Sequence, residues 1–171
     1  MPHREVTSCI HQVPIFRALP ADSVKRLQGA MQHGHFMPGQ QIIRMGDPVE
    51  CLVVVASGLL KLSRTSKSGR EQIIRELGPG QFYGEMALFT PVASEGDLIA
   101  VQETHACLLD RSAVQTELQS QPGLAVPLVE AIAQRLAEAE RAIGDLALLD
   151  VGERLAAELL RLGEAGEHTA E

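Results

Sequence analysis

Residues 84–97 read GEMALFTPVASEGD, and this stretch combines two halves of opposite character. The first half has a glycine, a carboxylate and a short apolar run, a combination typical of a backbone cradle for a phosphate at the start of a helix. The second half places Glu95 and Asp97 where such a cradle would favour positive charge. The stretch is therefore a working ligand site, an altered one, or a fold element that has lost its ligand.

The residues around this stretch predict a strand-rich domain. Between residues 35 and 110, short apolar runs are separated by turns that contain glycine, such as MPGQQ, RMGDP and SKSGRE. This spacing is typical of the short strands of a β-roll or jelly roll, a double-stranded β-helix. Residues 10–33 instead have apolar positions at helical spacing, with a helix start near Pro20. The predicted fold class is mainly β with flanking helices.

From about Pro122 the apolar period becomes helical and predicts a long helix over residues 124–149. Its apolar residues follow alternating steps of three and four, which is the a/d spacing of a coiled coil. A helix that packs on its own sheet usually has a wider apolar face. We therefore expect a homodimer rather than packing within one subunit, through a seam of Val129, Ile132, Leu136, Ala139, Ile143 and Leu146.

The composition indicates a globular protein of a reducing compartment. The net charge of −7 at pH 7 argues against broad contact between these residues and nucleic acid. The basic residues from Lys61 to Arg75 are interrupted by polar and acidic ones, so we expect the solvent-facing side of a hairpin. The N-terminus lacks the apolar core of a signal peptide, and the longest apolar run, residues 52–56, is too short to cross a bilayer. With three unclustered cysteines, these features predict a cytoplasmic location and no membrane contact.

Several motifs occur in an order that resembles the CRP/FNR family of bacterial transcription regulators. LGPGQFYGEMALF resembles the entry into the family's cyclic-nucleotide cassette, and QRLAEAERAIGDLALLDVGERLAAELLRL resembles its dimer helix and hinge. The resemblance implies a cyclic-nucleotide-binding-like β-roll with N-terminal helices over residues 1–121, a dimerisation helix over 122–150 and a hinge helix with a tail over 151–171. It also implies a helix-turn-helix that reads DNA. No segment after Leu162 has the length for one, so we expect either that this domain lies outside these residues or that the protein has discarded it.

The resemblance also implies where a cyclic nucleotide would bind. In that family, backbone amides of the cassette hold the cyclic phosphate, and Glu85 matches the carboxylate that accepts a hydrogen bond from the ribose. An Arg-Ser or Arg-Thr pair binds the phosphate, but its positions hold Glu95 and Gly96. Hydroxyl side chains of the dimer helix meet the base, but their positions hold Ala139 and Glu140. The candidate pocket comprises Gly84, Glu85, Met86, Ala87, Glu95, Gly96, Asp97, Ala139 and Glu140.

These differences predict that cAMP and cGMP do not bind. Two opposite unit charges ~4 Å apart attract by about 4 kcal/mol at an effective dielectric constant of ~20, and a reversed charge changes the balance by about twice that. Two alternatives remain for the stretch. Either Gly84 and Glu85 serve only a tight turn and a local hydrogen bond, or Glu85, Glu95 and Asp97 select a cationic or neutral effector, whose identity is unknown.

The cysteines and histidines give further candidates. FNR-type relatives hold an iron–sulfur cluster with several cysteines, and three cysteines cannot supply a four-cysteine cluster within one chain. Cys9 could form a redox pair with Cys107, although buried cysteines without a redox role are the simpler interpretation. His33 and His35 could ligate a metal or haem, as in a haem-binding branch of the family. Without a third ligand we interpret them as a surface turn and expect no metal site.

The sequence favours a regulatory protein over an enzyme. No nucleophile, base and orienting group occur at a motif spacing, and no cluster of His and Glu on adjacent strands, as a jelly-roll metalloenzyme needs, is apparent. The leading hypothesis is the sensory and dimerisation domain of a CRP/FNR-type regulator. It would not respond to cAMP, and it would pass its signal allosterically to a DNA-binding domain outside these residues. The alternative is a stand-alone cyclic-nucleotide-binding-like regulatory module without a role in DNA binding.

Overall fold

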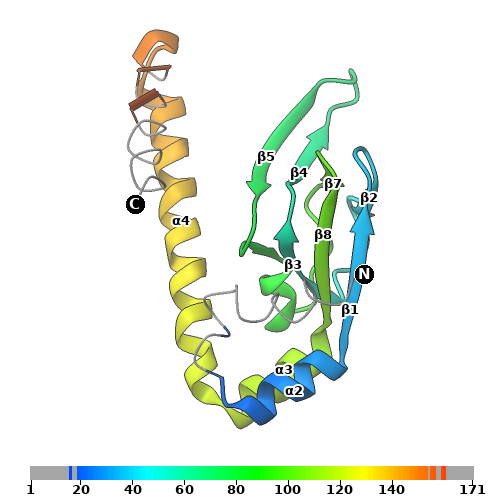
Figure 1. The fold of residues 1–171 in the computed structure, drawn as a ribbon. Helices are drawn as coiled ribbons and strands as arrows, with labels where there is room; N and C mark the ends of the chain where they lie inside the picture. Colours follow the sequence, from blue (N-terminus) through cyan, green and yellow to red (C-terminus); the bar gives the residue numbers. More distant parts are fainter. Residues whose placement is uncertain (1–15, 17–18, 154, 157–158, 161–171) are drawn as a thin grey trace. The chain divides into compact units, whose positions relative to one another are not determined.

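The computed structural model describes Phe16 and residues 19–153, 155–156 and 159–160. It confirms antiparallel β-sheets with flanking helices and a long C-terminal helix (Figure 1). The chain divides into two compact units, residues 1–128 and 129–171, and each is described by itself. The domain boundaries at residues 121 and 150 stay a prediction.

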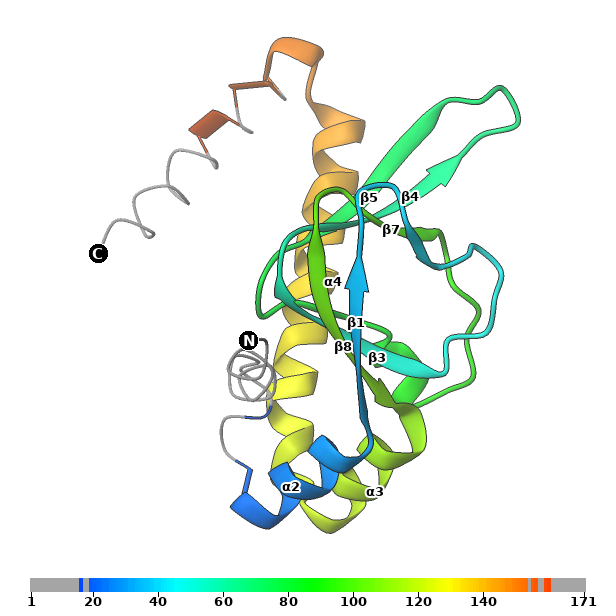
Figure 2. The same ribbon diagram turned by 45° about the vertical axis from the view of Figure 1, so that its right-hand side comes forward.

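In the described part of the chain, eight strands form two antiparallel sheets of four strands (Figures 1 and 2). The first sheet has the order β1-β8-β3-β6 and the second the order β2-β7-β4-β5. The strands are β1 (Met31–Phe36), β2 (Gln41–Ile43), β3 (Cys51–Ser57), β4 (Leu60–Thr65), β5 (Glu71–Leu77), β6 (Phe82–Tyr83), β7 (Asp97–Ala100) and β8 (Thr104–Asp110).

The helices precede, interrupt and follow this strand region. The main helices are α2 (Ala21–Gly29), α3 (Arg111–Ser120), α4 (Ala125–Leu148) and the short 3-10 turns η3 (Glu85–Leu88) and η4 (Pro122–Leu124). The described residues 151–153, 155–156 and 159–160 are helical as well. The bounds of α4 agree with the long helix predicted over residues 124–149. Among the described residues, none of these helices combines the length and apolar character that a bilayer span requires.

Strand β3 is buried on both faces and separates two core clusters. Leu52 and Val54 pack with apolar residues of α2, α3 and the start of α4. Val53 and Val55 point the other way and pack with residues of β4, β5 and β7 between the two sheets. Because successive strand residues face opposite sides, a strand buried on both faces reads as a continuous apolar run. This accounts for the run at residues 52–56.

The N-terminal helix is shorter than the helical pattern over residues 10–33 predicts. Among the described residues α2 ends at Gly29, and the Ala30 N–H donates to the carbonyl of Arg26 at 3.2 Å. Met31 begins β1, which pairs with β8 from Met31↔Leu109 onward. The prediction was wrong for residues 31–33 because pairing with a distant strand overrode the local helical spacing. Residues 10–15 lie outside the described residues.

A side-chain ion pair joins α2 to α3. The Arg26 guanidinium donates two hydrogen bonds to the Glu117 carboxylate, with Nε–Oε1 and Nη2–Oε2 distances of 2.5 and 3.0 Å. Glu117 is buried, and Arg26 also donates to the Ser23 hydroxyl at 2.9 Å. The hydrogen bond from Arg26 lowers the pKa of the Glu117 carboxyl below its ordinary value, against the opposing effect of burial. The pair thus fixes the helices that cover the first sheet.

Candidate functional site

The cassette turn connects β6 to η3 and carries the first half of the candidate pocket. Gly84 has a φ of 99°, and a Cβ at this residue would lie 2.4 Å from the backbone oxygen of Cys51. The left-handed conformation and the close approach both exclude a side chain there. The turn buries Glu85 and Ala87, while Met86 is 48% exposed. These contacts favour the interpretation that Gly84 is required by the turn itself.

The segment that leads into β7 is held by hydrogen bonds within the domain. Ser94 Oγ lies 2.8 Å from the hydroxyl of Tyr83 and donates to the carbonyl of Gly96 at 2.6 Å. A Cβ on Gly96 would lie 2.5 Å from the backbone oxygen of Ser63 in β4. The Ser or Thr of the expected phosphate-binding pair therefore has no space at residue 96 unless β4 moves.

Glu95 is a solvent-facing residue paired with an arginine from another strand. Its side chain is 72% exposed, and its Oε2 lies 3.9 Å from Nη2 of Arg64 in β4. Arg64 Nε also donates to the backbone carbonyl of Glu95. An ion pair this exposed contributes little to stability. Sequence spacing does not reveal Arg64, because the two residues are 31 positions apart.

Asp97 has a structural role at the start of β7. Its Oδ1 accepts hydrogen bonds from Nε2 of Gln41 at 2.6 Å and from the backbone N–H of Met45 at 2.8 Å. These bonds join β7 to β2 and to the turn after it. The three acidic residues therefore have different surroundings. Glu85 is buried, Glu95 faces solvent, and Asp97 accepts hydrogen bonds from Gln41 and Met45.

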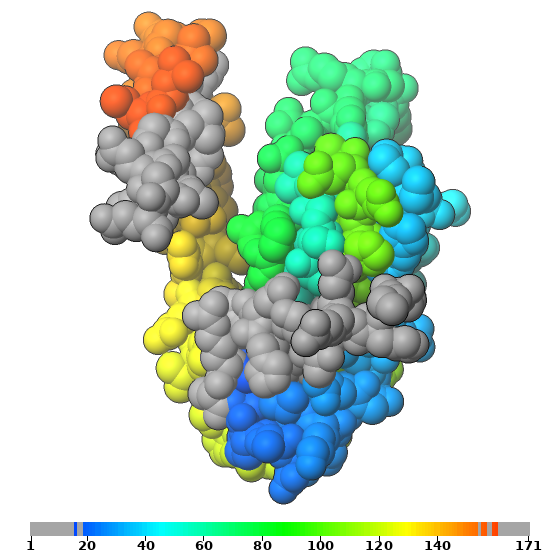
Figure 3. Space-filling view, in the orientation of Figure 1, coloured from blue at the N-terminus to red at the C-terminus, as the bar shows by residue number. Residues whose placement is uncertain are grey.

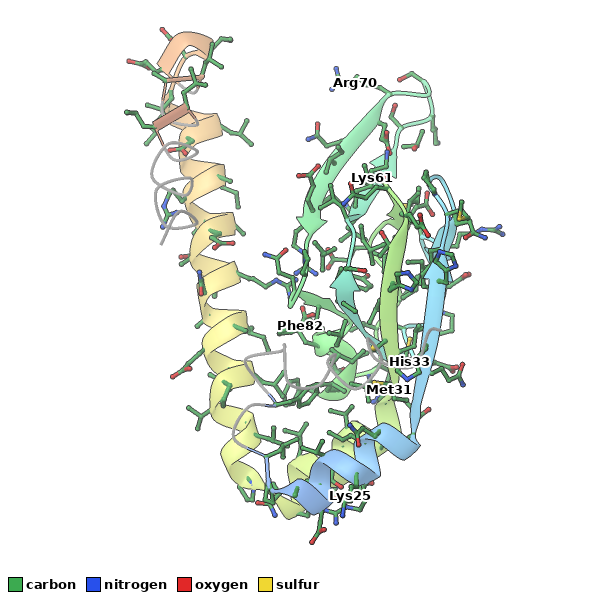
Figure 4. The ribbon with its side chains drawn as sticks, viewed as in Figure 1. Lys25, Met31, His33, Lys61, Arg70 and Phe82 are labelled. Atoms are coloured by element: carbon green, nitrogen blue, oxygen red, sulfur yellow. The ribbon has the colours of Figure 1, made fainter. Side chains whose placement is uncertain are left out.

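The basic residues of the β4–β5 hairpin do not all face solvent, contrary to expectation. Lys61, labelled in Figure 4, has a side chain only 22% exposed and contacts Glu71 at 2.7 Å. Arg75 Nη2 donates to the carbonyl of Phe82 at 2.8 Å, and its guanidinium carbon lies 5.8 Å from the centre of the Tyr83 ring. Because Phe82 and Tyr83 directly precede Gly84, Arg75 places a cation beside the cassette turn that sequence spacing did not indicate.

The other pocket candidates, Ala139 and Glu140, lie on α4 in the second unit, where both are exposed. Their part in a pocket stays a prediction. The predicted seam lies on the same helix. Ile132 is half-buried, and the large apolar side chains Val129, Leu136, Ile143 and Leu146 are between 57% and 69% exposed.

His33 and His35 lie in strand β1, not in a surface turn as expected; Figure 4 labels His33. The register of β1 and β8 places His35 opposite His105, and their rings stack with centroids 4.6 Å apart. Nε2 of His35 also lies 2.8 Å from Oε1 of Glu103. The structure thus brings together His35 of β1, His105 of β8 and Glu103, which directly precedes β8. The sequence did not reveal this group because 68 positions separate His35 from Glu103.

The redox hypothesis pairs Cys107 with Cys9, which lies outside the described residues, so that hypothesis stays a prediction. Cys107 is buried in β8, and its Sγ lies 3.6 Å from Nδ1 of His33. Cys51 is half-buried at the start of β3, and burial is the main cause that raises the pKa of its thiol. A raised pKa lowers the thiolate fraction and therefore the reactivity of Cys51 at neutral pH.

Comparison with known families decides the assignment. Residues 33–121 match the sequence profile of the cyclic nucleotide-binding domain, and this match covers more than half of the chain. The chain belongs to the cyclic nucleotide-binding domain family. The matched range contains the cassette turn, Glu95 to Asp97 and strands β2 to β8. The departures at residues 95 and 96 therefore lie inside the family domain.

Characterised relatives in this family include CRP-like regulators. A cyclic AMP receptor protein from Thermus thermophilus is 31% identical over 153 residues, which cover 90% of this chain and 71% of the relative. A CRP-like cAMP-activated global transcriptional regulator from Mycobacterium tuberculosis is 27% identical over 150 residues, covering 88% and 67%. The chain spans about two thirds of the length of these regulators.

Solved structures agree with this assignment. The catabolite activator protein of Thermus thermophilus has a TM-score of 0.67 and 30% identity, covering 78% of this chain and 63% of that one. The N-terminal domain of a transcriptional regulator from Streptomyces coelicolor A3(2) has a TM-score of 0.61 and 31% identity, covering 79% and 94%. The second of these structures is an N-terminal domain, and the chain covers nearly all of it.

Proposed function

We propose that this chain is the sensory and dimerisation module of a CRP-like transcription regulator. One observation carries the proposal: the similarity to CRP-like regulators extends over 150 residues or more, whereas the family domain itself covers residues 33–121. The aligned region is thus longer than a cyclic nucleotide-binding domain that occurs by itself. A shared region of this length supports a common use of the strand domain together with the long helix.

In the proposed mechanism, α4 couples the strand domain to DNA binding. Its apolar seam packs against the same helix of a second copy, so that two sensory domains share one coiled coil. An effector that prefers one arrangement of the dimer shifts the population toward it. The change in α4 then repositions DNA-binding domains that follow the helix.

A fusion protein tests this mechanism. The chain is joined at its C-terminus to a helix-turn-helix domain that binds its operator only as a dimer. We expect the fusion to bind the operator, and the same fusion with Ile143→Asp to lose binding, because a buried carboxylate in the seam is costly. Operator binding that is equal in both fusions would contradict a role for α4 in dimerisation.

We further propose that the effector is not cAMP or cGMP. Glu95 presents a carboxylate where relatives are expected to carry the phosphate-binding arginine, and the backbone oxygen of Ser63 leaves no space for a side chain on Gly96. The guanidinium of Arg64 donates to the Glu95 carbonyl, and that of Arg75 donates to the Phe82 carbonyl. These contacts support a site that lacks the bidentate phosphate anchor.

Titration calorimetry with cAMP and cGMP tests the second proposal. We expect no binding heat at tens of micromolar nucleotide for the unmodified chain. The matched variant Glu95→Arg reverses the charge at the anchor position and should increase nucleotide affinity by at least about tenfold, which requires only about 1.4 kcal/mol. Micromolar binding of either nucleotide by the unmodified chain would refute the charge argument.

A further inference from the structure

We propose that His35, Glu103 and His105 form a binding site for a divalent transition-metal ion of the Zn²⁺ class. One nitrogen from each histidine and one oxygen from the glutamate all lie within 4.8 Å of one another. Imidazole and carboxylate are common Zn²⁺ ligands, and three protein ligands with a solvent position form an open site. The donor set also suits Ni²⁺ and Cu²⁺, whereas Mg²⁺ and Ca²⁺ prefer oxygen ligands alone.

A bound ion would require the three ligand atoms to move from their present positions into one coordination sphere. Bonds of about 2.1 Å in a tetrahedral centre place the ligand atoms about 3.4 Å apart. Nε2 of His35 and Oε1 of Glu103 are 2.8 Å apart. The His35 and His105 rings are stacked with an interplanar angle of 6°, so one ring must turn before a nitrogen of each points at the same ion. The His35 and Glu103 side chains are 51% and 63% exposed, so neighbouring atoms do not prevent the rotation.

The backbone that carries the ligands is held in place more firmly than their side chains. His35 and His105 are opposite each other in an antiparallel ladder, and β8 is paired on both of its edges. Thr104 lies between Glu103 and His105 in the sequence and is fully buried. Its Oγ1 accepts a hydrogen bond from the Leu59 N–H at 3.0 Å. Ligands on such fixed elements lose little freedom when they bind an ion.

Two of the proposed ligand atoms are already in contact. Nε2 of His35 and Oε1 of Glu103 lie 2.8 Å apart, and both are of the kinds that bind Zn²⁺. In Figure 3 the surface atoms of the blue β1–β2 region and the yellow-green β7–β8 region lie side by side. The group lies where β1 and β8 pair, within reach of solvent.

Titration calorimetry of the complete chain with Zn²⁺ tests the site. We expect one ion per chain, with affinity reduced at least about tenfold in both His105→Ala and Glu103→Gln. Both side chains are exposed, so the fold should persist, and circular dichroism checks this. His33→Ala is the matched control, because His33 lies two residues from His35 on the same strand but outside the group. It should bind Zn²⁺ as the unmodified chain does.

Co²⁺ gives a second readout, because its visible absorption reports the ligands around the ion. The bands should appear with the unmodified chain and with His33→Ala, and should be lost with His105→Ala. The proposal is overturned if the unmodified chain binds no Zn²⁺ at about 100 μM, an affinity of about 5.5 kcal/mol. It is also overturned if all three variants bind alike, which would point to His3, His11 or His168 outside the described residues.

Discussion

Gly84 and Gly78 are both glycines near the cassette, but only one of them is required by its surroundings. Gly84 has a positive φ, and a Cβ there would lie 2.4 Å from the backbone oxygen of Cys51. At Gly78 a Cβ would meet no atom within 4 Å, and its φ is not in the left-handed region. The backbone therefore requires a glycine at residue 84 but not at residue 78.

We predict that Gly84→Ala lowers the free energy of unfolding by about 3 kcal/mol, because it combines backbone strain with a steric clash. Gly78→Ala is the control and should change stability by less than about 1 kcal/mol. Urea denaturation of both variants measures the difference. Equal stabilities would mean that the Gly84 turn tolerates a side chain, and that its glycine then serves a ligand.

For single residues, the sequence identifies those of the cassette but not the distant residues that contact them in the fold. GEMALF is a local motif, so Gly84 and Glu85 could be recognised without a structure. Arg64 reaches Glu95 only through the pairing of β4 with β7, and Arg75 reaches Phe82 only because β5 ends near β6. Charges brought together by tertiary structure cannot be counted along the sequence.

Among the elements, α2 and α3 are joined by an ion pair between the half-exposed Arg26 and the buried Glu117. Arg26 has a side chain 55% exposed, whereas that of Glu117 is 3% exposed. A buried carboxylate without its partner would carry the cost of desolvation. Loss of the contact would therefore cost more free energy at the buried Glu117 carboxylate than at the half-exposed Arg26 guanidinium.

We predict that the stabilising effect of Glu117 depends on pH. The hydrogen bond from Arg26 lowers the pKa of Glu117 below its ordinary value of 4.5. A carboxylate of this kind stabilises the fold above its unfolded pKa, and the effect is lost as the pH falls through the folded pKa. Glu117→Gln should therefore lower the free energy of unfolding by about 2 kcal/mol at neutral pH. The difference should shrink below pH 4.5.

Urea denaturation across this pH range measures the effect, with Glu76→Gln as the control because Glu76 is an exposed carboxylate of β5. The control should stay close to the unmodified protein throughout. A deficit of Glu117→Gln that is constant down to strongly acidic pH would contradict the role of the carboxylate charge.

The elements also show where local patterns give way to long-range pairing. The helical period of residues 124–149 is a property of one segment, and that helix was predicted correctly. The use of its a/d positions in a coiled coil stays a prediction. Met31 and Gln32 were assigned to a helix, but they belong to β1 because β8 offers a complete ladder of partners. The His35 and His105 stack depends on the same register.

For the whole molecule, the exposed seam of α4 is the feature with the clearest consequence for assembly. Leu136 and Ile143 are 59% and 66% exposed. Repeated exposed apolar residues along one helix are typical of a surface that a partner covers. A second copy of this chain fits best, because the a/d spacing matches itself in a parallel coiled coil.

We predict that the chain is a dimer in solution and that Ile143→Asp makes it monomeric. The substitution places a charge in the seam, where two copies would bring two carboxylates together. Ala137→Asp introduces the same side chain on α4 outside the seam and should leave the dimer intact. Light scattering coupled to size-exclusion chromatography measures the mass of each variant. An unchanged dimer with Ile143→Asp would place the interface elsewhere.

The close approach between Gly96 and β4 sets a condition for introducing an Arg-Ser pair at residues 95 and 96. An arginine can be introduced at residue 95, where the side chain faces solvent. A serine at residue 96 would meet the Ser63 carbonyl, so the second half of the phosphate-binding pair cannot be transplanted alone. A successful graft must carry the β4 backbone around Ser63 together with the pair. The side chains that residue 96 can carry are thus limited by the backbone of a different strand.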